Sequence, residues 1–526
     1  MWHALKGSAA RGRLTISGFA ELAARRRFAT FGVPGLATPD DCARLARAAA
    51  SSSDALAEAI VTAAARPSAA SLQVLDEISS TLCGVLDPLE LARNVHPQVG
   101  FRQAADAAYH ELAACMAEYS TDERLYAAVR AVLDDKRVAA SLSSEWLRFA
   151  HCMVHEFEHD GAGLPSSARN NLRALQAHEA DLGQRFAAGA TARNPHGGVW
   201  APQWALVNLP AGLRAALHTR GELVLLPADR SLLTMALQHV HCATSRREIY
   251  ECREALAPDN LEVLSELLQT RHAIARALGR QSYADYALSH DRMETCAEDV
   301  AAALTALSHA LMPRTRSELE TLARMRQTLI QTHCDGAAPA ETNGGTADAV
   351  APWDLAYLME QSRASAYGTD AAELSSYLEL EACLRGLQLV LSEGFGLSLQ
   401  PVAAAEGELW HGSVRKLLLG TQANEGQPAT PRGILYLDLT PRAGKTGHPA
   451  LYTLRTGASL KSAGRADEHP LLMRHLPAAA LVCDLPVSNG LGADPRSGKA
   501  LLRPRQLETL YHEMGHAIHA LLARTE

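Results

Sequence analysis

Two histidines near the carboxyl end have the spacing of a metal-binding pair. His512 and His516 lie four residues apart, and Glu513 directly follows the first of them. On a helix the two imidazoles are about 40° apart, one turn above the other on the same face. In this His-Glu-x-x-His pattern two neutral imidazoles bind Zn²⁺ and the carboxylate takes a proton from bound water. The pattern predicts Zn²⁺ at His512 and His516, with Glu513 as the base.

The surrounding residues predict the helix that would position this pattern. Pro504 suits the first turn of a helix. Apolar residues recur on the side opposite the histidines, namely Leu507, Leu510, Met514, Ala517, Ile518 and Leu521. Arg503 stands where a Ser or Thr cap is preferred, a loss of about 1 kcal/mol of helix stability. Gly515 leaves room for another backbone to approach closely. We therefore expect one buried helix face and one that lines a cleft.

The same five-residue pattern occurs a second time, at residues 155–159. Residues 160–165 read Asp-Gly-Ala-Gly-Leu-Pro, which ends a helix within about a turn. Phe157 and Glu158 would place a bulky ring and an extra carboxylate beside any metal. We interpret this copy as a solvated, polar helix end and not as a metal site.

Length and composition indicate a globular chain and exclude several classes of function. A chain of 526 residues has room for two or more domains or for one large helical body. A net charge of −8 argues against a general nucleic-acid binder. The ten cysteines include no C-x-x-C pair, which favours free thiols in a reducing compartment. Apolar runs of about 18 residues are absent, so we expect no membrane insertion. A monomer is expected.

The amino-terminal residues differ in composition from the rest of the chain. Residues 1–38 contain one acidic residue, Glu21, and six lysines and arginines, with Ser and Thr interspersed. This composition, without the apolar core of a secretory signal, predicts a mitochondrial transit peptide over residues 1–30 that leaves the mature protein. A disordered basic tail is the alternative.

The rest of the chain predicts a mainly α-helical protein with a small sheet. Helical periodicity over residues 39–332 predicts a helical lobe that spans residues 31–335. A low-complexity run at residues 336–352 predicts a flexible insertion, and residues 374–391 are again helical. Alternating patterns then predict short strands at residues 433–439, 450–454 and 479–485, and a loop follows at 487–499. An exposed sheet edge could pair with an extended peptide beside the metal.

Residues 510–525 resemble the active-site helix of the thimet oligopeptidase family of zinc metallopeptidases. The resemblance runs from about Phe31 to the last residue, and it is carried by residues 31–36, 75–83, 94–97, 407–411, 414–416 and 436–445. Residues 336–352 and 487–499 match poorly. The segment 75–83 and the basic leader favour the mitochondrial, precursor-processing member over its cytosolic relatives.

The resemblance implies a mainly α fold, with two helical lobes around a deep channel that admits extended peptides. It implies that Zn²⁺ is held by His512 and His516, and that Glu513 shuttles a proton to the leaving amine during peptide hydrolysis. His519 is interpreted as a hydrogen-bonded or surface histidine. The mitochondrial member works in the matrix and removes an N-terminal octapeptide from imported precursor proteins.

One departure from the family concerns the metal. A catalytic zinc site needs three protein ligands, and the family's third is a glutamate on the helix after the second histidine. The sequence stops ten residues after His516, so residues 353–526 are interpreted as the start of a catalytic region that is truncated after the zinc helix. We expect poor zinc retention and little activity from this chain. A cytosolic thimet-type oligopeptidase and an inactive helical peptide-binding scaffold remain the alternatives.

Overall fold

The structure is a computed structural model of the whole chain. It describes residues 30–64, 66–191, 197–209, 214–215, 217–255, 257, 259–290, 296–333, 350–368, 371–422, 429–457, 476–485 and 498–523. The predicted transit peptide, the insertion at 336–352 and the loop at 487–499 lie almost entirely outside these ranges. The described residues are mainly helical, as predicted. None of their helices is long and apolar enough to cross a membrane.

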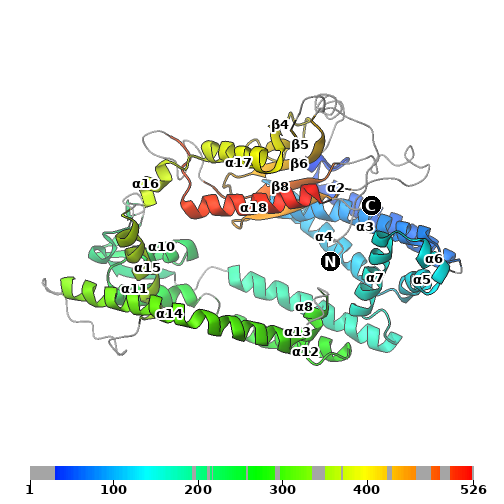
Figure 1. The fold of residues 1–526 in the computed structure, drawn as a ribbon, viewed down its shortest axis with the longest axis horizontal. Coiled ribbons are helices and arrows are strands. Elements are labelled where there is room, and N and C mark those ends of the chain that lie inside the picture. Colours follow the sequence, from blue (N-terminus) through cyan, green and yellow to red (C-terminus); the bar gives the residue numbers. More distant parts are fainter. Residues whose placement is uncertain are drawn as a thin grey trace. The chain divides into compact units, whose positions relative to one another are not determined.

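The chain forms two compact units (Figure 1). One unit combines Met1–Gly163 with Ala371–Glu526, and the other is Leu164–Asp370. The division that we predicted, a helical lobe over 31–335 followed by a catalytic region from 353, differs from these units. Helices near the amino terminus join the carboxyl-terminal sheet in one unit, because both faces of that sheet are apolar and need a helical cover.

The first unit begins with a short 3-10 helix, η1 (Thr30–Gly32), and a group of α-helices. Their bounds are α2 (Pro39–Ala63), α3 (Ala69–Val95), α4 (Val99–Ser120), α5 (Glu123–Asp134), α6 (Lys136–Ser141) and α7 (Ser144–His159). Pro39 occupies the first turn of α2, where its missing N–H costs nothing, and Asp122 and Asp135 cap α5 and α6. Helices α2, α3 and α4 pack on one another, and α3 also packs on the sheet.

A five-stranded sheet occupies the middle of this unit. Its strands are β4 (Leu397–Pro401), β5 (Arg415–Thr421), β6 (Pro431–Asp438), β7 (Ala450–Arg455) and β8 (Ala478–Val482). The order is β4-β5-β6-β8-β7, in which β6 and β8 run parallel and every other pair is antiparallel. The predicted strands at 433–439, 450–454 and 479–485 are confirmed as β6, β7 and β8. We did not predict β4 and β5.

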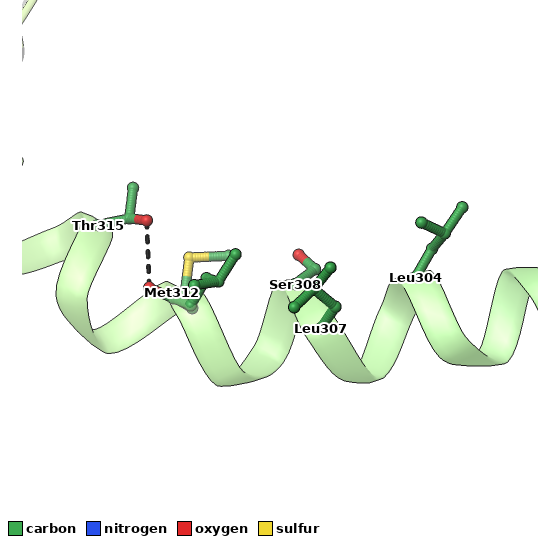
Figure 2. Close-up of a pocket in the computed structure, with 6 residues that line it drawn as sticks. Leu304, Leu307, Ser308, Met312 and Thr315 are labelled. Carbon is green, nitrogen blue, oxygen red and sulfur yellow. Dashed lines mark hydrogen bonds between the residues drawn. The ribbon is translucent and has the colours of Figure 1, made fainter. Parts of the chain in front are cut away.

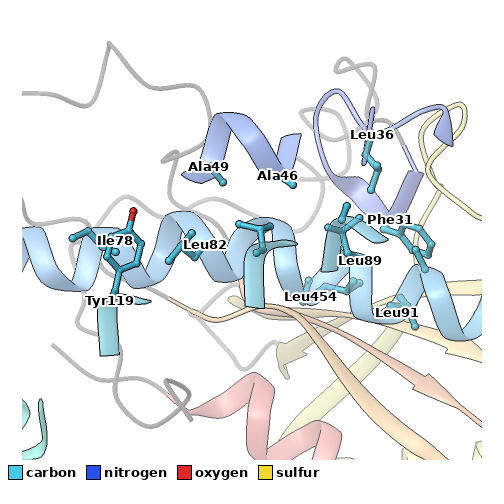
Figure 3. Packing of buried hydrophobic residues seen from close by; sticks show 14 of the residues in the cluster. Phe31, Leu36, Ala46, Ala49, Ile78, Leu82, Leu89, Leu91, Tyr119 and Leu454 are labelled. Atoms are coloured by element: carbon cyan, nitrogen blue, oxygen red, sulfur yellow. The ribbon is translucent and has the colours of Figure 1, made fainter. Parts of the chain in front are cut away.

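Both faces of this sheet are buried, which explains why β6 and β8 read as almost continuous apolar runs. Ile434 and Ala480 join the core formed with α2–α7. Figure 3 shows part of this core around Leu82, Leu89 and Leu454. Their neighbours Leu435 and Leu481 point to the opposite face and join a second core. The period of two along each strand therefore divides its side chains between two hydrophobic clusters.

Three helices complete the first unit: α16 (Ala371–Ser376), α17 (Leu380–Phe395) and α18 (Pro504–Leu522). The helix that we predicted over 374–391 is interrupted between Ser376 and Leu380, where Leu380 N–H donates to the carbonyl of Ala500 (2.9 Å). Helix α17 ends at Gly396, whose left-handed backbone (φ 62°) suits a residue without Cβ. Helix α18 lies across β6, β7 and β8 (Figure 1).

The second unit contains a small sheet inside a stretch that we predicted to be helical. The strands β1 (Gly198–Pro202), β2 (His218–Arg220) and β3 (Leu223–Pro227) pair in the order β1-β3-β2. Its remaining elements are η2 (Gln203–Leu206), α8 (Ser166–Thr191), α10 (Arg230–His239), α11 (Ala243–Glu254), α12 (Asn260–Ala277), α13 (Tyr283–His290), α14 (Ala297–His333) and α15 (Pro352–Tyr367). Val224 and Leu226 pack under α10 and α11, so the strands exist because of non-local packing that helix periodicity did not reveal.

A buried ion pair joins three helices of the second unit. Arg246 of α11 donates to the carboxylate of Asp354 on α15 (3.0 Å from Nε), and Arg326 of α14 lies 3.2 Å from the other oxygen. Nearer its amino terminus, α14 lines a shallow hollow with side chains of that helix alone (Figure 2). Leu304, Leu307 and Met312 give it an apolar wall. Because none of its lining residues titrates, we assign no chemistry to this hollow.

Candidate active site

Helix α18 forms as the sequence predicts. Pro504 begins it, and the backbone N–H of Arg503 donates to Oε1 of Gln506 (2.9 Å), so the side chain of the third helical residue partly replaces the missing Ser or Thr cap. The predicted apolar face is confirmed. Leu510, Met514, Ala517 and Leu521 are buried against the sheet, and Leu507 and Ile518 lie partly buried beside them.

The two predicted zinc ligands lie together on the exposed face of this helix. Nε2 of His516 is 3.1 Å from Nε2 of His512, and the two rings meet edge to face with centroids 4.7 Å apart. Two imidazole nitrogens that bind one tetrahedral Zn²⁺ at 2.0–2.1 Å are separated by about 3.3 Å. The pair therefore already has nearly the separation that a shared Zn²⁺ requires, and this donor set fits the metal.

Glu513 lies on the flank of the helix, between the exposed His512 and the buried Met514. It is half-buried, and its charge reaches Cys483, just beyond the end of β8. Burial, reinforced by the charge of Glu513, raises the pKa of the Cys483 thiol to about 12. The thiol is thus neutral at physiological pH, and it gives Glu513 an uncharged neighbour on the sheet side.

A third ligand is not present in the part of the chain that the structure describes. Among these residues no three His, Cys, Asp or Glu side chains are arranged to hold a metal ion. His519 is exposed one turn beyond His516, on the same helix. Its interpretation as a surface or hydrogen-bonded histidine stays a prediction.

The upstream copy of the motif lies at the end of α7. The ring of Phe157 is in the core, only 1% exposed. His159 is buried, and its Nδ1 lies 3.3 Å from Oδ1 of Asp160. The helix ends at His159 as we predicted, but our description of a solvated end is wrong, because both His159 and Asp160 are buried. A carboxylate partner, and not solvent, satisfies this imidazole.

Gly515 does not have the role that we expected. A Cβ added there would meet no heavy atom of the described residues within 4 Å, so no backbone approaches it. The close approach occurs instead at Gly433 in β6, where an added Cβ would come within 2.8 Å of the Leu521 side chain. The glycine that allows α18 to pack closely against the sheet is therefore Gly433 in the strand, and not Gly515 in the helix.

A buried polar network that sequence reasoning missed holds the strand end next to Glu513. The ammonium of Lys445 donates to the carbonyls of Asp438 (2.9 Å) and Cys483 (2.7 Å), and so ties the ends of the parallel strands β6 and β8. Arg442 binds the Asp438 carboxylate through both guanidinium nitrogens (2.6 and 2.7 Å). The spacing Asp-x-x-x-Arg-x-x-Lys directly after a strand is the sequence signal that could have predicted this network.

Tyr511 anchors the site helix from its other side. Its hydroxyl donates to the backbone carbonyl of Cys383 in α17 (2.9 Å). A Cβ at Gly386 would come 3.2 Å from the same hydroxyl, so the glycine leaves space for it. This bond joins the helix that carries the histidines to the helix beside it.

Comparison with known proteins also indicates a peptidase. Residues 236–526 match the sequence profile of Peptidase family M3. The chain is 30% identical to "Mitochondrial intermediate peptidase 1" of Cryptococcus neoformans var. neoformans serotype D (strain B-3501A), over 94% of this chain and 66% of that protein. It is 30% identical to "Mitochondrial intermediate peptidase" of Pleurotus djamor (86% of this chain, 58% of that protein) and 28% identical to that of Pongo abelii (94% and 62%).

The chain thus spans 66%, 58% and 62% of the length of these three relatives. The matched family region includes α18 with both histidines and Glu513, and it covers more than half of the 526 residues. From the motif, the geometry of the helix that carries it and these similarities together, the chain belongs to Peptidase family M3.

Proposed function

We propose that this chain carries the zinc-site helix of a metalloendopeptidase that removes an N-terminal octapeptide from imported precursor proteins in the mitochondrial matrix, and that it contributes two metal ligands and the base but not the third ligand. The observation that carries the proposal is the His512–His516 pair, whose Nε2 atoms converge at 3.1 Å on the exposed face of α18 with Glu513 beside them. The family and the names of the relatives support the same reaction.

Each side chain of the motif has a separate task. His512 and His516 would hold Zn²⁺ through Nε2, and the metal when bound polarises the scissile carbonyl and acidifies water. The carboxylate of Glu513 accepts a proton from the attacking water and delivers it to the leaving amine. The neutral Cys483 thiol adds no second negative charge beside Glu513.

The substrates proposed are extended peptides, namely the amino termini of precursor proteins. Strand β7 is the last strand of the sheet on the side of β8, and α18 packs against it. An extended peptide could add to this edge by backbone hydrogen bonds, which require no particular side chains and so suit an enzyme with many precursors. Nucleic acid and membrane lipid have no place in this proposal.

The proposed location rests on the leader. Residues 1–30 have the basic, acid-poor composition of a mitochondrial transit peptide. A reporter fused to these residues is expected to enter mitochondria. Diffuse cytosolic fluorescence would favour a cytosolic oligopeptidase instead.

The reaction is tested with Glu513→Gln. Purified chain is incubated with Zn²⁺ and a presequence-like peptide under single-turnover conditions, and the cleavage products are identified by mass spectrometry. The variant keeps both histidines, so we expect unchanged zinc affinity in calorimetric titration and a hydrolysis rate lower by roughly 10²–10⁴-fold.

Two matched variants distinguish a histidine that binds zinc from one that does not. His512→Ala is expected to abolish both zinc binding and hydrolysis, whereas His519→Ala changes neither. If the wild-type chain, with Zn²⁺ bound as shown by calorimetric titration, binds the peptide but does not cleave it, the protein is a binding scaffold and the proposal is wrong.

A further inference from the structure

The middle of helix α14 is an apolar surface that no other described element covers. Residues 300–313 contain no Asp, Glu, Lys or Arg, and every residue from 301 to 321 is exposed. Leu304 is 61%, Leu307 56% and Leu311 51% exposed. A helical stretch that is apolar on all sides is ordinarily buried in a folded protein. Its exposure therefore indicates a surface to which another protein surface binds.

The helix is held at its two ends and not in its middle. At the amino-terminal end, the N–H of Ala297 donates to Oδ1 of Asp285 in α13 (3.0 Å). At the other end, Leu322 packs with Tyr357 and Leu358 of α15. Both ends are thus fixed within the second unit, and the exposed stretch between them, about 31 Å long, is available to a partner.

The exposed leucines lie along one side of this stretch. Leu304, Leu307 and Leu311 follow one another at intervals of three and four residues. Figure 2 shows Leu304, Ser308 and Met312 on the same side of the helix, around the hollow described above. Apolar residues at these intervals form the contact side of a helix that packs along another helix. We therefore expect the partner to present a helix.

Two opposite charges flank this stripe of leucines. Glu298 precedes it, and Arg316 follows 18 residues later. Eighteen residues are about five full turns, so the two side chains lie on the same flank of the helix. Arg314 binds Glu318 of its own helix (2.9 Å), whereas Arg316 forms no ion pair with any residue that the structure describes. The guanidinium of Arg316 is therefore available to a carboxylate of another chain.

The positions of these charges fit a second copy of the same helix. Leu307 lies nine residues from each of them. If a second α14 packs antiparallel on the stripe, about a two-fold axis at Leu307, each Glu298 faces the Arg316 of the other copy. Two ion pairs then form at once, as a two-fold interface requires. In the same arrangement Leu304 lies beside the second copy's Leu311, whereas a parallel pair would bring like charges together.

We propose that this chain forms a homodimer through residues 298–316 of α14, which pack antiparallel against the same residues of a second copy. This dimer differs from the monomer that we expected from the sequence. A single helix pair is a small interface, so we expect monomer and dimer to exchange at micromolar concentrations. The inference does not depend on the proposed function, because the zinc-site helix belongs to the other unit.

The experiment measures sedimentation velocity of the full chain at increasing concentrations. Leu307→Glu is expected to weaken the dimer by at least about a hundredfold, because it buries two carboxylates against each other at the axis. Ala306→Glu is the matched control: it adds the same charge one residue away, at an exposed position on the side opposite the stripe. The control variant should dimerise like the wild type, and circular dichroism checks that both variants are folded.

Three outcomes of this measurement would overturn the proposal. The first is a wild-type chain that sediments as a monomer at every concentration. The second is a dimer that Leu307→Glu leaves intact. The third is an equal loss of the dimer in Leu307→Glu and Ala306→Glu, which would show that added charge acts without regard to the stripe.

Exchange of the two charges tests the direction of the helix pair. Glu298→Arg and Arg316→Glu are each expected to weaken the dimer by about tenfold, because both facing pairs become repulsive. An equimolar mixture of the two variants is expected to restore it, since each chain then offers the charge that the other lacks. Single variants that dimerise as tightly as the wild type would show that Glu298 and Arg316 do not meet, and would overturn the arrangement.

Cross-linking locates the contact directly. In Arg316→Lys, a carbodiimide can join the carboxylate of Glu298 to the new amine without a spacer. Within one helix these positions are about 27 Å apart, so the amide forms only between two copies. We expect mass spectrometry of the dimer band to identify a peptide that links positions 298 and 316. A cross-linked dimer without this peptide would contradict the antiparallel pair.

Discussion

At the scale of residues, the chemistry of the site depends on two environments around one helix turn. His512 and His516 face solvent, where a metal ion and a peptide can reach them. Glu513, between them in sequence, is half-buried, and its charge acts on the neutral thiol of Cys483. Because successive residues on a helix are 100° apart, neighbours in the motif point in different directions. In the proposed reaction, this separation would let His512 and His516 hold the metal while Glu513 takes a proton from water beside it.

His96 provides a prediction at this scale about acid stability. It follows α3, and its ring is buried and stacked on Phe101 (3.9 Å between centroids). Burial, together with the nearby Arg102 and Arg442, lowers the pKa of His96 to about 4, from an ordinary value of 6.5. Between these values the unfolded chain binds a proton that the folded chain does not. The stability that the neutral His96 gives the folded chain is therefore fully present above pH 6.5, and it is lost as the pH falls toward 4.

The expected size of this effect is about 3 kcal/mol at pH 4, since each unit of pKa difference corresponds to about 1.4 kcal/mol. The measurement is the free energy of unfolding of the wild type and of His96→Phe from pH 7 to pH 4. The wild type should lose stability relative to the variant across this interval. Parallel curves for the two proteins would show that folding does not lower the pKa of His96.

At the scale of elements, the position of α18 on the sheet depends on one glycine in a strand. Gly433 of β6 faces Leu521, near the end of α18, and the two cannot both keep their places if Gly433 gains a Cβ. Gly515, in the helix itself, faces open space among the described residues. We therefore predict that alanine changes the stability of the protein in opposite directions at these two glycines.

We expect Gly433→Ala to destabilise the protein by about 1–3 kcal/mol, because the added methyl overpacks the helix–sheet contact. Gly515→Ala should stabilise it by about 0.5–1 kcal/mol, because alanine loses less backbone entropy in a helix. Guanidinium unfolding of both variants, monitored by circular dichroism, gives the comparison. A shift of both variants in the same direction would contradict the described packing.

At the scale of the whole molecule, the first unit is assembled from parts far apart in the sequence. Helix α3, with α2 and α4 packed on it, covers one face of a sheet whose strands begin more than two hundred residues later, and α17 and α18 cover the other. The cysteines reflect this burial. No disulfide joins any of the nine within the described residues, and they range from the exposed Cys296 to the buried Cys42 and Cys483.

This distribution predicts a wide range of thiol reactivity in the native protein. Burial raises the pKa of Cys42 to about 11 and that of Cys483 to about 12. Their thiolate fractions near neutral pH are then at least about a hundredfold below that of an ordinary cysteine. Timed alkylation and peptide mapping should label Cys296 first, and Cys42 and Cys483 only after unfolding. Early labelling of Cys483 in native protein would contradict its burial beside Glu513.

The sequence by itself determined those features that depend on local periodicity. The motif at His512, its exposed face, the buried face from Leu510 to Leu521 and the strands β6, β7 and β8 all follow from side-chain spacing within one element. Where the pattern was weak, as in β4, β5 and the small sheet of the second unit, prediction failed. Short strands there are stabilised by partners distant in the chain, and local propensity does not record such partners.

Only the tertiary structure decided how these elements meet. The order of the strands, the closeness of Cys483 to Glu513, the ion pairs of Lys445 and the burial of Phe31 against Trp410 join residues that are remote in sequence. Each depends on which surfaces exclude water together, which is a property of the folded chain and not of any one segment. For the same reason the buried His159 could not be distinguished from a solvated one by its motif.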